Sequence, residues 1–345
     1  MEQLDMNGRS EPRATIVDVA NASGLSVGTV SNYLNGQKLR KANEIRIEAA
    51  IAALNFTRNE SAASMKTTRS RLVGMLVPTL SEFHGGLVEN ISTRLQKQRR
   101  ALLTICHNRE PALMGDALRF FQEQRVCALV IAGHSHLESQ LKEFSRDGIP
   151  ILALTNDSPS IAMHRLVTDG ADASRRAVRH LADLGHRRIA VLAGALREAT
   201  GEERLAGYRR GLQEAGLPID ERLIAAGDFK PGPAYGALSA LFEQADKPTA
   251  IYSCGGSMTF GALQFLSERG LKIPDDISLV SFDDSNAFRL RERPVTVLSQ
   301  RRQALAEAVS DLVAACAEAG NPLPLTRQVF SCDLISRESC RSLHR

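Results

Sequence analysis

The sequence predicts an α/β protein with a small helical head and a larger core of doubly wound parallel sheets. Within residues 15–54, short helical patterns are separated by glycine. From residue 72 onward, short apolar runs alternate with amphipathic helical stretches, a pattern typical of parallel sheets covered on both faces. Because a chain of 345 residues is too long for one hydrophobic core, we expect two or three domains.

The head begins with a capped helix. Thr15 and Asp18 have the Thr-x-x-Asp spacing of a capping box, in which each side chain accepts a hydrogen bond from the other residue's backbone N–H. Three small apolar residues should form the buried face of this helix: Val17, Val19 and Ala20. Gly24 then permits a sharp turn, since glycine readily adopts positive φ.

A second helix follows the turn, and a third completes the head. Ser26 caps the second helix, which ends at Asn35-Gly36. We expect Asn43 to cap the third helix. Its apolar residues are spaced to cover the first two helices: Ile47, Ala50, Ile51 and Leu54. This arrangement can place one short helix in the major groove of DNA, so the pattern predicts a helix-turn-helix unit.

Most of the net positive charge lies in and next to the head. Residues 1–71 hold ten Lys and Arg against seven Asp and Glu, which leaves +3 of the formal charge of +4 carried by the whole chain. Basic side chains neutralise backbone phosphates and supply affinity that does not depend on base sequence. A plain solvated surface would show the same charge, so the helix-turn-helix pattern is the stronger indication of DNA binding.

Composition argues against several other classes. No apolar run approaches the length needed to span a membrane, and the polar N-terminus lacks the apolar segment of an export signal. We therefore expect residues 1–13 to be a disordered lead-in on a cytoplasmic, nucleoid-associated protein. The six cysteines are scattered without a Cys-x-x-Cys pair, so we expect free thiols, no bound metal and no cofactor.

The core divides into two series of alternating strands and helices. In the first series, strands at 72–77, 101–106, 128–132 and 151–154 alternate with helices at 86–99, 112–124 and 137–147. In the second series, helices at 171–184, 203–215, 233–244 and 258–269 alternate with strands at 189–193, 224–225, 250–253 and 278–282. Open parallel sheets hold ligands beyond the carboxyl ends of their strands, so we expect a small-molecule site between two lobes.

Motifs spread along the chain match one known family. In the head they are Thr15-Ile-Val-Asp-Val-Ala20, followed by Thr-Val-Ser and Leu-Asn-Gly. In the core they are Leu184-Gly-His-Arg-Arg-Ile189, Arg204-Leu-Ala-Gly-Tyr208, Ile273-Pro-Asp-Asp-Ile-Ser278, Phe282-Asp-Asp284 and Ser336-Arg-Glu-Ser339. With these motifs, residues 14–340 resemble the lactose-repressor/galactose-repressor (LacI/GalR) family of bacterial transcription regulators.

The resemblance implies a domain organisation and an assembly. It implies a helix-turn-helix DNA-binding domain at 14–57, a hinge helix or linker at 58–70, and a two-lobed, periplasmic-binding-protein-like core at 71–340. The N-lobe would comprise about 71–166 and 298–327, and the C-lobe about 167–297 and 328–340. It further implies a homodimer, or a tetramer, that binds a pseudo-palindromic double-stranded operator. A small effector in the cleft, such as a sugar or sugar derivative, would change the affinity for DNA.

The resemblance also assigns DNA contacts in the head. Residues that face base edges would be Val27, Gly28, Thr29 and Asn32. Residues that contact phosphates or hold the helix would be Thr15, Ser26, Ser31, Tyr33 and Asn35, with core packing as the alternative role of Tyr33. Because Gly28 has no side chain and Asn32 stands where the family often has Arg, we expect fewer base contacts than in many relatives.

Residues 55–70 resemble the hinge segment of the family, which becomes helical on the operator and inserts apolar side chains into the minor groove. Met65 stands at the position of the inserted side chain, and the resemblance adds Asn59, Ala62 and Lys66 as DNA contacts. A plain linker is the alternative role for this segment.

Seven residues match effector contacts of the family: Phe83, His84, Thr200, Arg204, Phe229, Gly255 and Asp283. Arg204 offers a forked donor for a carboxylate, a phosphate or neighbouring hydroxyls, and Asp283 can accept from sugar hydroxyls. Arg204 could instead pair with Glu202 or Asp228. Where many relatives have Asn-Asp, this chain has Gly255-Gly256, so either a bulkier ligand fills the space or backbone amides at a helix N-terminus hold an anionic group.

Other classes of protein are less well supported. A solute-binding receptor without DNA function would share the two lobes, but it would need an export signal and would have no use for residues 14–70. A regulator without an effector is a second alternative. We do not expect an enzyme, since Cys254 and histidines such as His84 and His186 belong to no nucleophile-base order or metal spacing. The sequence therefore predicts a sequence-specific DNA-binding repressor that a small molecule controls.

Overall fold

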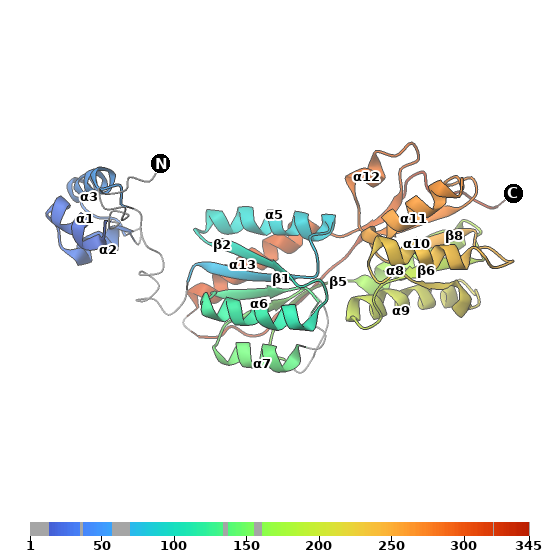
Figure 1. Ribbon diagram of the computed structural model, residues 1–345, viewed down its shortest axis with the longest axis horizontal. Helices are drawn as coiled ribbons and strands as arrows, with labels where there is room; N and C mark the ends of the chain where they lie inside the picture. Colours follow the sequence, from blue (N-terminus) through green and yellow to red (C-terminus); the bar gives the residue numbers. More distant parts are fainter. Residues whose placement is uncertain are drawn as a thin grey trace, which may run out of the picture. The chain divides into compact units, whose positions relative to one another are not determined.

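The computed structural model describes residues 14–34, 37–56, 70–133, 137–154, 161–319 and 321–344. The chain divides into two compact units, Met1–Ser70 and Arg71–Arg345. The first unit is helical, and the second is built from sheets covered by helices (Figure 1). The predicted fold class, a helical head and a two-lobed α/β core, is therefore confirmed.

The first unit is a three-helix head made of α1 (Ile16–Ser23), α2 (Val27–Leu34) and α3 (Lys41–Ala53). The expected capping box is present, because Thr15 Oγ1 accepts from Asp18 N at 3.3 Å and Asp18 Oδ2 accepts from Thr15 N at 2.7 Å. Gly24 ends α1 with a φ of 62°. Ser26 Oγ accepts from Thr29 N at 3.2 Å at the start of α2, as predicted.

The expected start of α3 is wrong. Asn43 does not cap this helix, which begins two residues earlier at Lys41 after a residue that makes no side-chain cap. The segment before α3 is fixed instead by Glu44, whose carboxylate accepts a hydrogen bond from Leu39 N at 3.1 Å. A carboxylate in the first turn also interacts favourably with the helix dipole.

The core of the head forms where the three helices meet. Its buried residues are Val19, Ala20, Val30, Ile47 and Ala50. The expectation that Val17 shares this face is wrong, since its side chain is 50% exposed. Residues two apart point in roughly opposite directions on a helix, so Val17 and Val19 cannot face the same core. The expected end of α2 at Asn35-Gly36 lies outside the described residues.

The N-lobe of the second unit has a parallel sheet in the order β11-β5-β4-β3-β1-β2. Its strands are β1 (Leu72–Val77), β2 (Ala101–Cys106), β3 (Ala128–Ile131), β4 (Ile151–Ala153), β5 (His164–Thr168) and β11 (Arg327–Phe330). Its helices are α5 (Glu82–Lys97), α6 (Pro111–Glu123), α7 (Glu138–Arg146) and α13 (Arg302–Glu318). Two hydrophobic clusters lie on its two faces, one beneath α5 and α13 and the other beneath α6 and α7.

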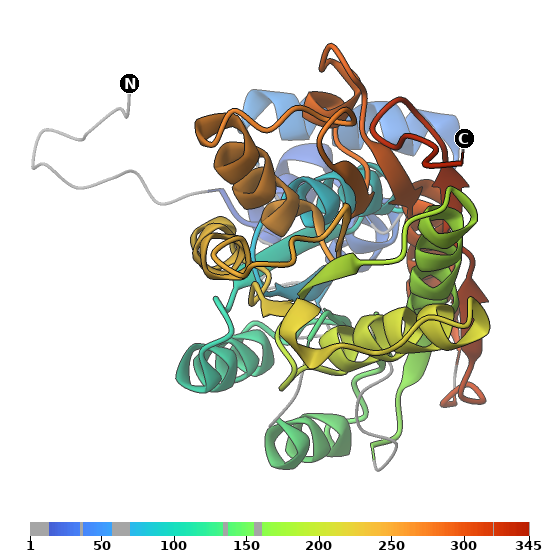
Figure 2. The same ribbon diagram turned by 90° about the vertical axis from the view of Figure 1, so that its right-hand side faces the viewer.

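The C-lobe has a sheet in the order β12-β10-β9-β8-β6-β7, in which only the β10–β12 pair is antiparallel among the described strands. Its strands are β6 (Ile189–Ala193), β7 (Ile224–Ala226), β8 (Ala250–Ser253), β9 (Ser278–Phe282), β10 (Thr296–Ser299) and β12 (Asp333–Ile335). Its helical elements are α8 (Gly170–Asp183), α9 (Ala199–Glu214), the 3-10 turn Glu221–Leu223, α10 (Pro231–Leu241), α11 (Gly256–Glu268) and α12 (Asn286–Arg289). Helices α8 and α9 pack together, as do α10 and α11, and the two pairs cover opposite faces of the sheet (Figure 2).

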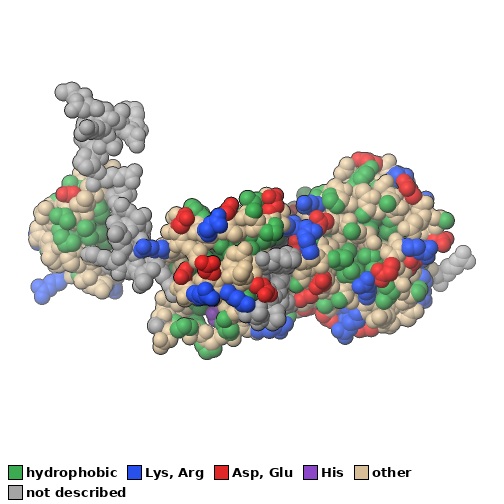
Figure 3. Space-filling model, turned by 60° about the horizontal axis from the view of Figure 1, so that its bottom comes forward, with side chains coloured by type: hydrophobic (Ala, Val, Ile, Leu, Met, Phe, Trp, Pro, Cys, Tyr) green, Lys and Arg blue, Asp and Glu red, His purple; other side chains and the backbone are tan. Residues whose placement is uncertain are grey.

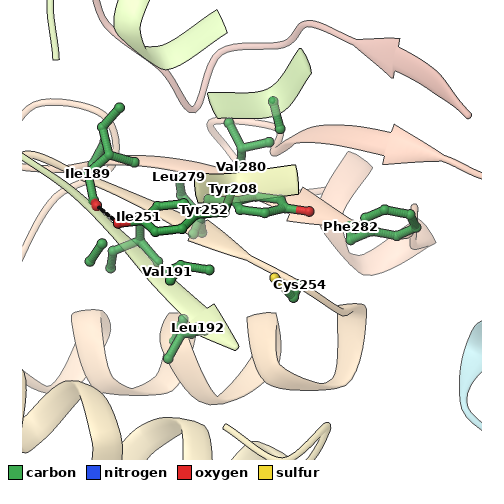
Figure 4. Packing of buried hydrophobic residues seen from close by; sticks show 14 of the residues in the cluster. Ile189, Val191, Leu192, Tyr208, Ile251, Tyr252, Cys254, Leu279, Val280 and Phe282 are labelled. Atoms are coloured by element: carbon green, nitrogen blue, oxygen red, sulfur yellow. Dashed lines mark hydrogen bonds between the residues drawn. The ribbon is translucent and has the colours of Figure 1, made fainter. Parts of the chain in front are cut away.

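Buried aromatic residues fill the centre of the C-lobe. Tyr208 and Tyr252 are fully buried, and both hydroxyl groups have hydrogen-bond partners. Tyr208 donates to Ile189 O at 2.8 Å (Figure 4). The Tyr252 hydroxyl lies 2.6 Å from Ser174 Oγ. These bonds satisfy polar atoms that would otherwise cost free energy in an apolar core.

The chain crosses between the lobes after β5, after β10 and after β11. The crossings lie slightly later than the boundaries expected at 166, 297 and 327, since β10 is hydrogen-bonded in the C-lobe sheet and β11 in the N-lobe sheet. Each strand keeps its register to its end before the chain changes lobe. Apolar periodicity predicted none of β5, β10, β11 and β12.

Two core helices begin four residues earlier than expected, α5 at Glu82 and α9 at Ala199. Ser81 caps α5, since its hydroxyl accepts from His84 N at 3.4 Å. Residues near the start of each helix therefore belong to a helical turn that points at the carboxyl edge of a sheet.

Helices α8 and α9 approach each other closely because glycines line the contact. A Cβ added at Gly207 would lie 2.1 Å from Ala171 O, and one at Gly211 would lie 2.7 Å from Val178 Cβ. By contrast, Gly236 in α10 has open space around the position of a Cβ.

We predict opposite effects of the same substitution at these two kinds of glycine. Gly207→Ala should lower the free energy of unfolding by about 1–3 kcal/mol, since overpacking forces the helices apart. Gly236→Ala should raise it by about 0.5–1 kcal/mol, because alanine loses less backbone entropy in a helix. Denaturant unfolding of the full chain measures both, and equal effects of the two variants would contradict the packing described here.

Candidate functional site

Helix α2 presents an exposed face of the kind that enters a DNA groove. Val27 is 36% exposed, and Gly28 and Asn32 are exposed, whereas Val30 points into the core of the head. Thr29 and Ser31 lie half-buried at the edges of this face, and the Ser26 hydroxyl lies 2.8 Å from that of Thr29. The DNA contacts predicted from the sequence at Asn35, Asn59, Ala62, Met65 and Lys66 lie outside the described residues.

Two contacts that the sequence did not indicate hold α2 and its turn against α3. Tyr33 donates its hydroxyl hydrogen to Glu48 Oε1 at 2.6 Å, and this bond to a carboxylate raises the pKa of Tyr33. Arg46 donates to Gly24 O at 3.2 Å across the turn. The hydroxyl of Tyr33 therefore holds the helix, one of the two roles that the resemblance allowed.

The second candidate site is a cavity between the lobes, at the carboxyl edges of both sheets. Its volume is about 130 Å³, enough for a group on the order of ten waters in size. The structure brings together there all seven residues predicted as effector contacts, Phe83, His84, Thr200, Arg204, Phe229, Gly255 and Asp283. The cavity lies beyond β1 and β6, where each sheet changes its winding direction, which is where open α/β sheets bind ligands.

Arg204 is buried in the wall of this cavity, with 6% of its surface exposed. Its Nη1 donates to Cys254 O at 2.6 Å, and its guanidinium lies 3.5 Å above the ring centroid of Phe282. The alternative pairing with Glu202 or Asp228 does not form, since Asp228 binds Arg197 at 2.9 Å. Within the described residues, no carboxylate lies close enough to Arg204 to form an ion pair.

Phe229 occupies the space that Gly194 and Gly255 leave open. A Cβ at Gly194 would lie 2.1 Å from Phe229 Cζ, and one at Gly255 would lie 3.1 Å from Phe229 Cδ1. The Phe229 ring also lies 5.3 Å from Arg109 Cζ and 5.9 Å from Arg204 Cζ. The missing side chains of Gly194 and Gly255 therefore leave room for an aromatic ring near two guanidinium groups.

Sequence reasoning missed an ion pair that joins the lobes across the cavity. Arg109, after β2 of the N-lobe, lies with its Nε 2.7 Å from Oε1 of Glu198, which precedes α9 of the C-lobe. Their side chains are only 9% and 13% exposed. Arg109 has a φ of 65°, a left-handed conformation that turns its side chain toward the cleft. No motif marks either residue, because the pair forms only when the lobes come together.

A second carboxylate also bridges the lobes. Glu82 in the first turn of α5 accepts from Ser285 Oγ at 2.5 Å and from Asn286 N at 3.0 Å, at the N-terminus of α12. Nearby, Asp283 Oδ1 accepts from Gln300 Nε2 at 2.6 Å. The sequence predicted Asp283 in this site but not its partner.

Asp284 is the structural anchor next to Asp283. Its side chain is 3% exposed and pairs with Arg289 at 2.5 Å and with Arg337 at 2.8 Å. Burial acts to raise the pKa of Asp284, but the two guanidinium groups outweigh burial and lower it. The charged carboxylate therefore ties the end of β9 to two other segments of the C-lobe.

The two histidines of this region are neutral at physiological pH. Burial, together with Arg109, Arg204 and His107, lowers the pKa of His84 to about 3. Burial and Arg109 lower the pKa of His107 to about 4, despite its hydrogen bond to Ala132 O. Burial is the larger cause of both shifts, and the positive charges of the nearby arginines act in the same direction.

The side chains that could act in catalysis, Cys254 and His186, are buried in the core of the C-lobe. Cys254 is fully buried, which raises the pKa of its thiol to about 12 and keeps it protonated. His186 is buried with its Nδ1 2.9 Å from Thr249 Oγ1. Within the described residues, no three His, Cys, Asp or Glu side chains come together as ligands for a metal ion. None of the described helices combines the length and apolarity needed to cross a bilayer.

Basic and acidic side chains are interspersed over the visible face of both lobes (Figure 3). A core of mixed charge offers no broad basic surface on that face for nucleic acid. The combination of an exposed helix in the head and a cavity in the core defines a class of protein, a DNA-binding regulator with a ligand-binding domain.

Comparisons with known proteins identify the family within this class. Residues 15–59 match the family model of bacterial regulatory proteins of the lacI family, and residues 178–340 match a periplasmic binding protein-like domain. The chain therefore combines a DNA-binding domain of the lacI family with a periplasmic binding protein-like domain. It is thus a DNA-binding repressor with an effector-binding core.

Relatives and solved structures agree with this assignment. The repressor PurR of Haemophilus influenzae is 27% identical over 299 residues, which cover 84% of this chain and 87% of the relative. PurR of Histophilus somni is 28% identical over 96% of this chain and the whole relative. The structure of the lac repressor dimer bound to operator and the anti-inducer ONPF is 25% identical, with a TM-score of 0.83 over 96% of this chain and all of that one. The complex of the regulator CelR with cellobiose is also 25% identical, with a TM-score of 0.71 over 95% of this chain and all of that one.

We predict that the ion pair between the lobes stabilises the core more than a surface pair does. Glu198→Gln should lower the free energy of unfolding by about 3 kcal/mol, because it leaves Arg109 charged and unpaired in a buried position. Glu338→Gln is the matched control, since Glu338 pairs with Arg293 and both are more than half exposed. The Glu338→Gln substitution should lower the free energy of unfolding by less than about 1 kcal/mol. Thermal or denaturant unfolding of the full chain compares the two, and similar losses would refute the role of Glu198.

Proposed function

We propose that the chain is a dimeric repressor that reads a two-fold-symmetric operator through its head and responds to a small hydroxylated ligand, a sugar or sugar derivative, in the cavity between its lobes. Residues 14–57 would form the DNA-binding domain, 58–70 the hinge and 71–340 the core. As a repressor it would act in the compartment that holds the chromosome. The lac repressor of known structure is a dimer bound to operator, which supports the assembly.

The observation that carries the DNA-binding part is the exposed face of α2. Val27, Gly28 and Asn32 lie on the exposed side of a helix whose start is capped and whose Val30 packs into the core of the head. An asparagine side chain can bond adenine, and valine can contact a thymine methyl group. The hydroxyls of Thr15, Ser26 and Ser31 are suited to phosphates, which fix the register of the helix in the groove.

The cavity supports control by a ligand because its walls come from both lobes. Asp283 of the C-lobe and Phe83 of the N-lobe line the same space. A ligand that contacts both would favour one separation of the lobes, and it can shift DNA affinity only as far as it prefers one arrangement of the dimer. CelR has been solved with cellobiose, which supports a hydroxylated ligand here.

Asn32→Ala tests base recognition by α2. The substitution should weaken binding to a selected operator roughly 10-fold or more, because one good pair of hydrogen bonds to a base contributes about 1–3 kcal/mol of discrimination. Affinity for random duplex should stay the same. Ile45→Ala, on the exposed side of α3, is the control and should bind as the unaltered chain does. Fluorescence anisotropy with both duplexes measures this. Equal losses on operator and random DNA would show that Asn32 does not read bases.

Asp283→Asn tests the effector part. Asparagine matches aspartate in shape and tolerates the φ of 72° at this position, so the fold should be kept. Loss of the charged acceptor should reduce the effect of the ligand on operator affinity about 10-fold, while binding to DNA without ligand stays unchanged. Asp275→Asn, an exposed acidic residue of the same lobe, is the control. An undiminished response in Asp283→Asn would remove this carboxylate from the site.

A further inference from the structure

The N-terminus of α11 lines the cavity with two residues whose backbone N–H groups have no acceptor among the described residues. Gly256 and Ser257 are the first residues of this 13-residue helix, and both line the cavity and are half-buried. Within the described part of the chain, neither N–H has a hydrogen-bond acceptor, whereas Met258 N and Thr259 N bond to Gly255 O. Free N–H groups at a helix N-terminus attract negative charge.

Arg204 is a second and independent indication of a ligand. Its guanidinium is more than nine-tenths buried, lines the same cavity and has Cys254 O as its one acceptor among the described residues. Its Nε is buried with no hydrogen-bond partner. Because Cys254 lies two residues before α11, the guanidinium and the N-terminus of the helix are close neighbours.

The carboxylates that line the cavity do not neutralise Arg204, because protein groups already hold each of them. Glu198 pairs with Arg109, and Glu82 accepts from Ser285 and Asn286. Asp284 pairs with two arginines, and one oxygen of Asp283 accepts from Gln300. A buried cation without a counter-charge is costly, and a bound anion would remove that cost.

We propose that the effector is a small hydroxylated anion, whose carboxylate or phosphate group binds between Arg204 and the N–H groups of Gly256 and Ser257. The inference rests on the proposed function and specifies the chemistry of its ligand. Asp283 lies beside this position, since a Cβ at Gly256 would be 3.4 Å from Asp283 Cβ. The other carboxylate oxygen of Asp283 accepts from a hydroxyl of the ligand. It does not contact the carboxylate or phosphate group of the ligand, because two negative charges repel each other. The small cavity, narrowed by Phe229, limits the ligand to roughly the size of one sugar.

Calorimetric titration of the full chain with matched neutral and anionic probes tests the proposal. The pairs are glucose with glucuronate, glucose with glucose 6-phosphate, and glycerol with glycerol 3-phosphate, with inorganic phosphate as a further probe. The anionic member of a pair should bind on the order of 10- to 100-fold more tightly than the neutral one, as expected for charge-assisted hydrogen bonds. The glucuronate and phosphate arms distinguish a carboxylate ligand from a phosphate ligand.

Two sets of variants locate the acid group. Gly256→Pro removes one N–H while proline fits the first helical position, and Gly256→Ala adds a Cβ but keeps the N–H. Anion affinity should be several-fold lower in Gly256→Pro than in Gly256→Ala. Arg204→Met, of similar volume, should lose anion affinity on the order of 10-fold or more, and Arg204→Lys should retain part of it. Unfolding measured without probe confirms that each variant is folded.

The result that overturns the proposal differs from the one that overturns the proposed function. Neutral probes that bind as tightly as their anionic partners, or no binding of any anionic probe, would overturn the anion site and leave DNA recognition intact. Equal anion affinity in Gly256→Pro and Gly256→Ala would remove the helix N-terminus from the site. Failure of the full chain to prefer any duplex sequence would instead contradict the proposed function.

Discussion

The structure of the core depends on charges that meet across the gap between its lobes. Arg109 of the N-lobe and Glu198 of the C-lobe form an ion pair whose side chains are almost fully buried, and Glu82 of the N-lobe bonds to the start of α12 in the C-lobe. The chain itself joins the lobes at short crossings, so these contacts set how far apart the lobes stand. Any ligand in the cavity must act against or together with them, because a buried pair that loses one partner is strongly destabilised.

Three residues that line the same cavity have strained backbone conformations. Arg109, Phe229 and Asp283 all have positive φ, which is unfavourable for residues other than glycine. Such conformations persist only where the surrounding structure enforces them, and they often lie at functional sites. Here each one directs a side chain toward the cavity, while Gly194 and Gly255 leave room for the ring of Phe229. At Gly255-Gly256 the cavity is therefore lined by an aromatic ring and by backbone N–H groups at the start of α11 that have no acceptor among the described residues.

Local chemistry in the sequence was sufficient for much of this architecture. The Thr15–Asp18 capping box and the strands of β1, β2, β6, β8 and β9 follow from cap spacing and apolar runs, because these features act over a few residues. The family resemblance placed Arg204 and Asp283 in one cavity. What sequence could not indicate depends on long-range contacts: the Arg109–Glu198 pair, the hold of Gln300 on Asp283, and strand β11, which is mostly exposed and lacks an apolar signature. The prediction that Val17 is buried was wrong for a simpler reason, because helix geometry turns its side chain away from that of Val19.

The central claim is that the cavity and the head act on one equilibrium, and reciprocal binding measurements test it most directly. The factor by which a ligand changes the affinity of the full chain for its operator must equal the factor by which operator changes the affinity for that ligand. Calorimetric titration of one ligand into the free chain and into the chain saturated with operator gives the second factor, and anisotropy gives the first. We expect two equal factors that both differ from one. A ligand that binds in the cavity with the same affinity whether or not operator is present would contradict it.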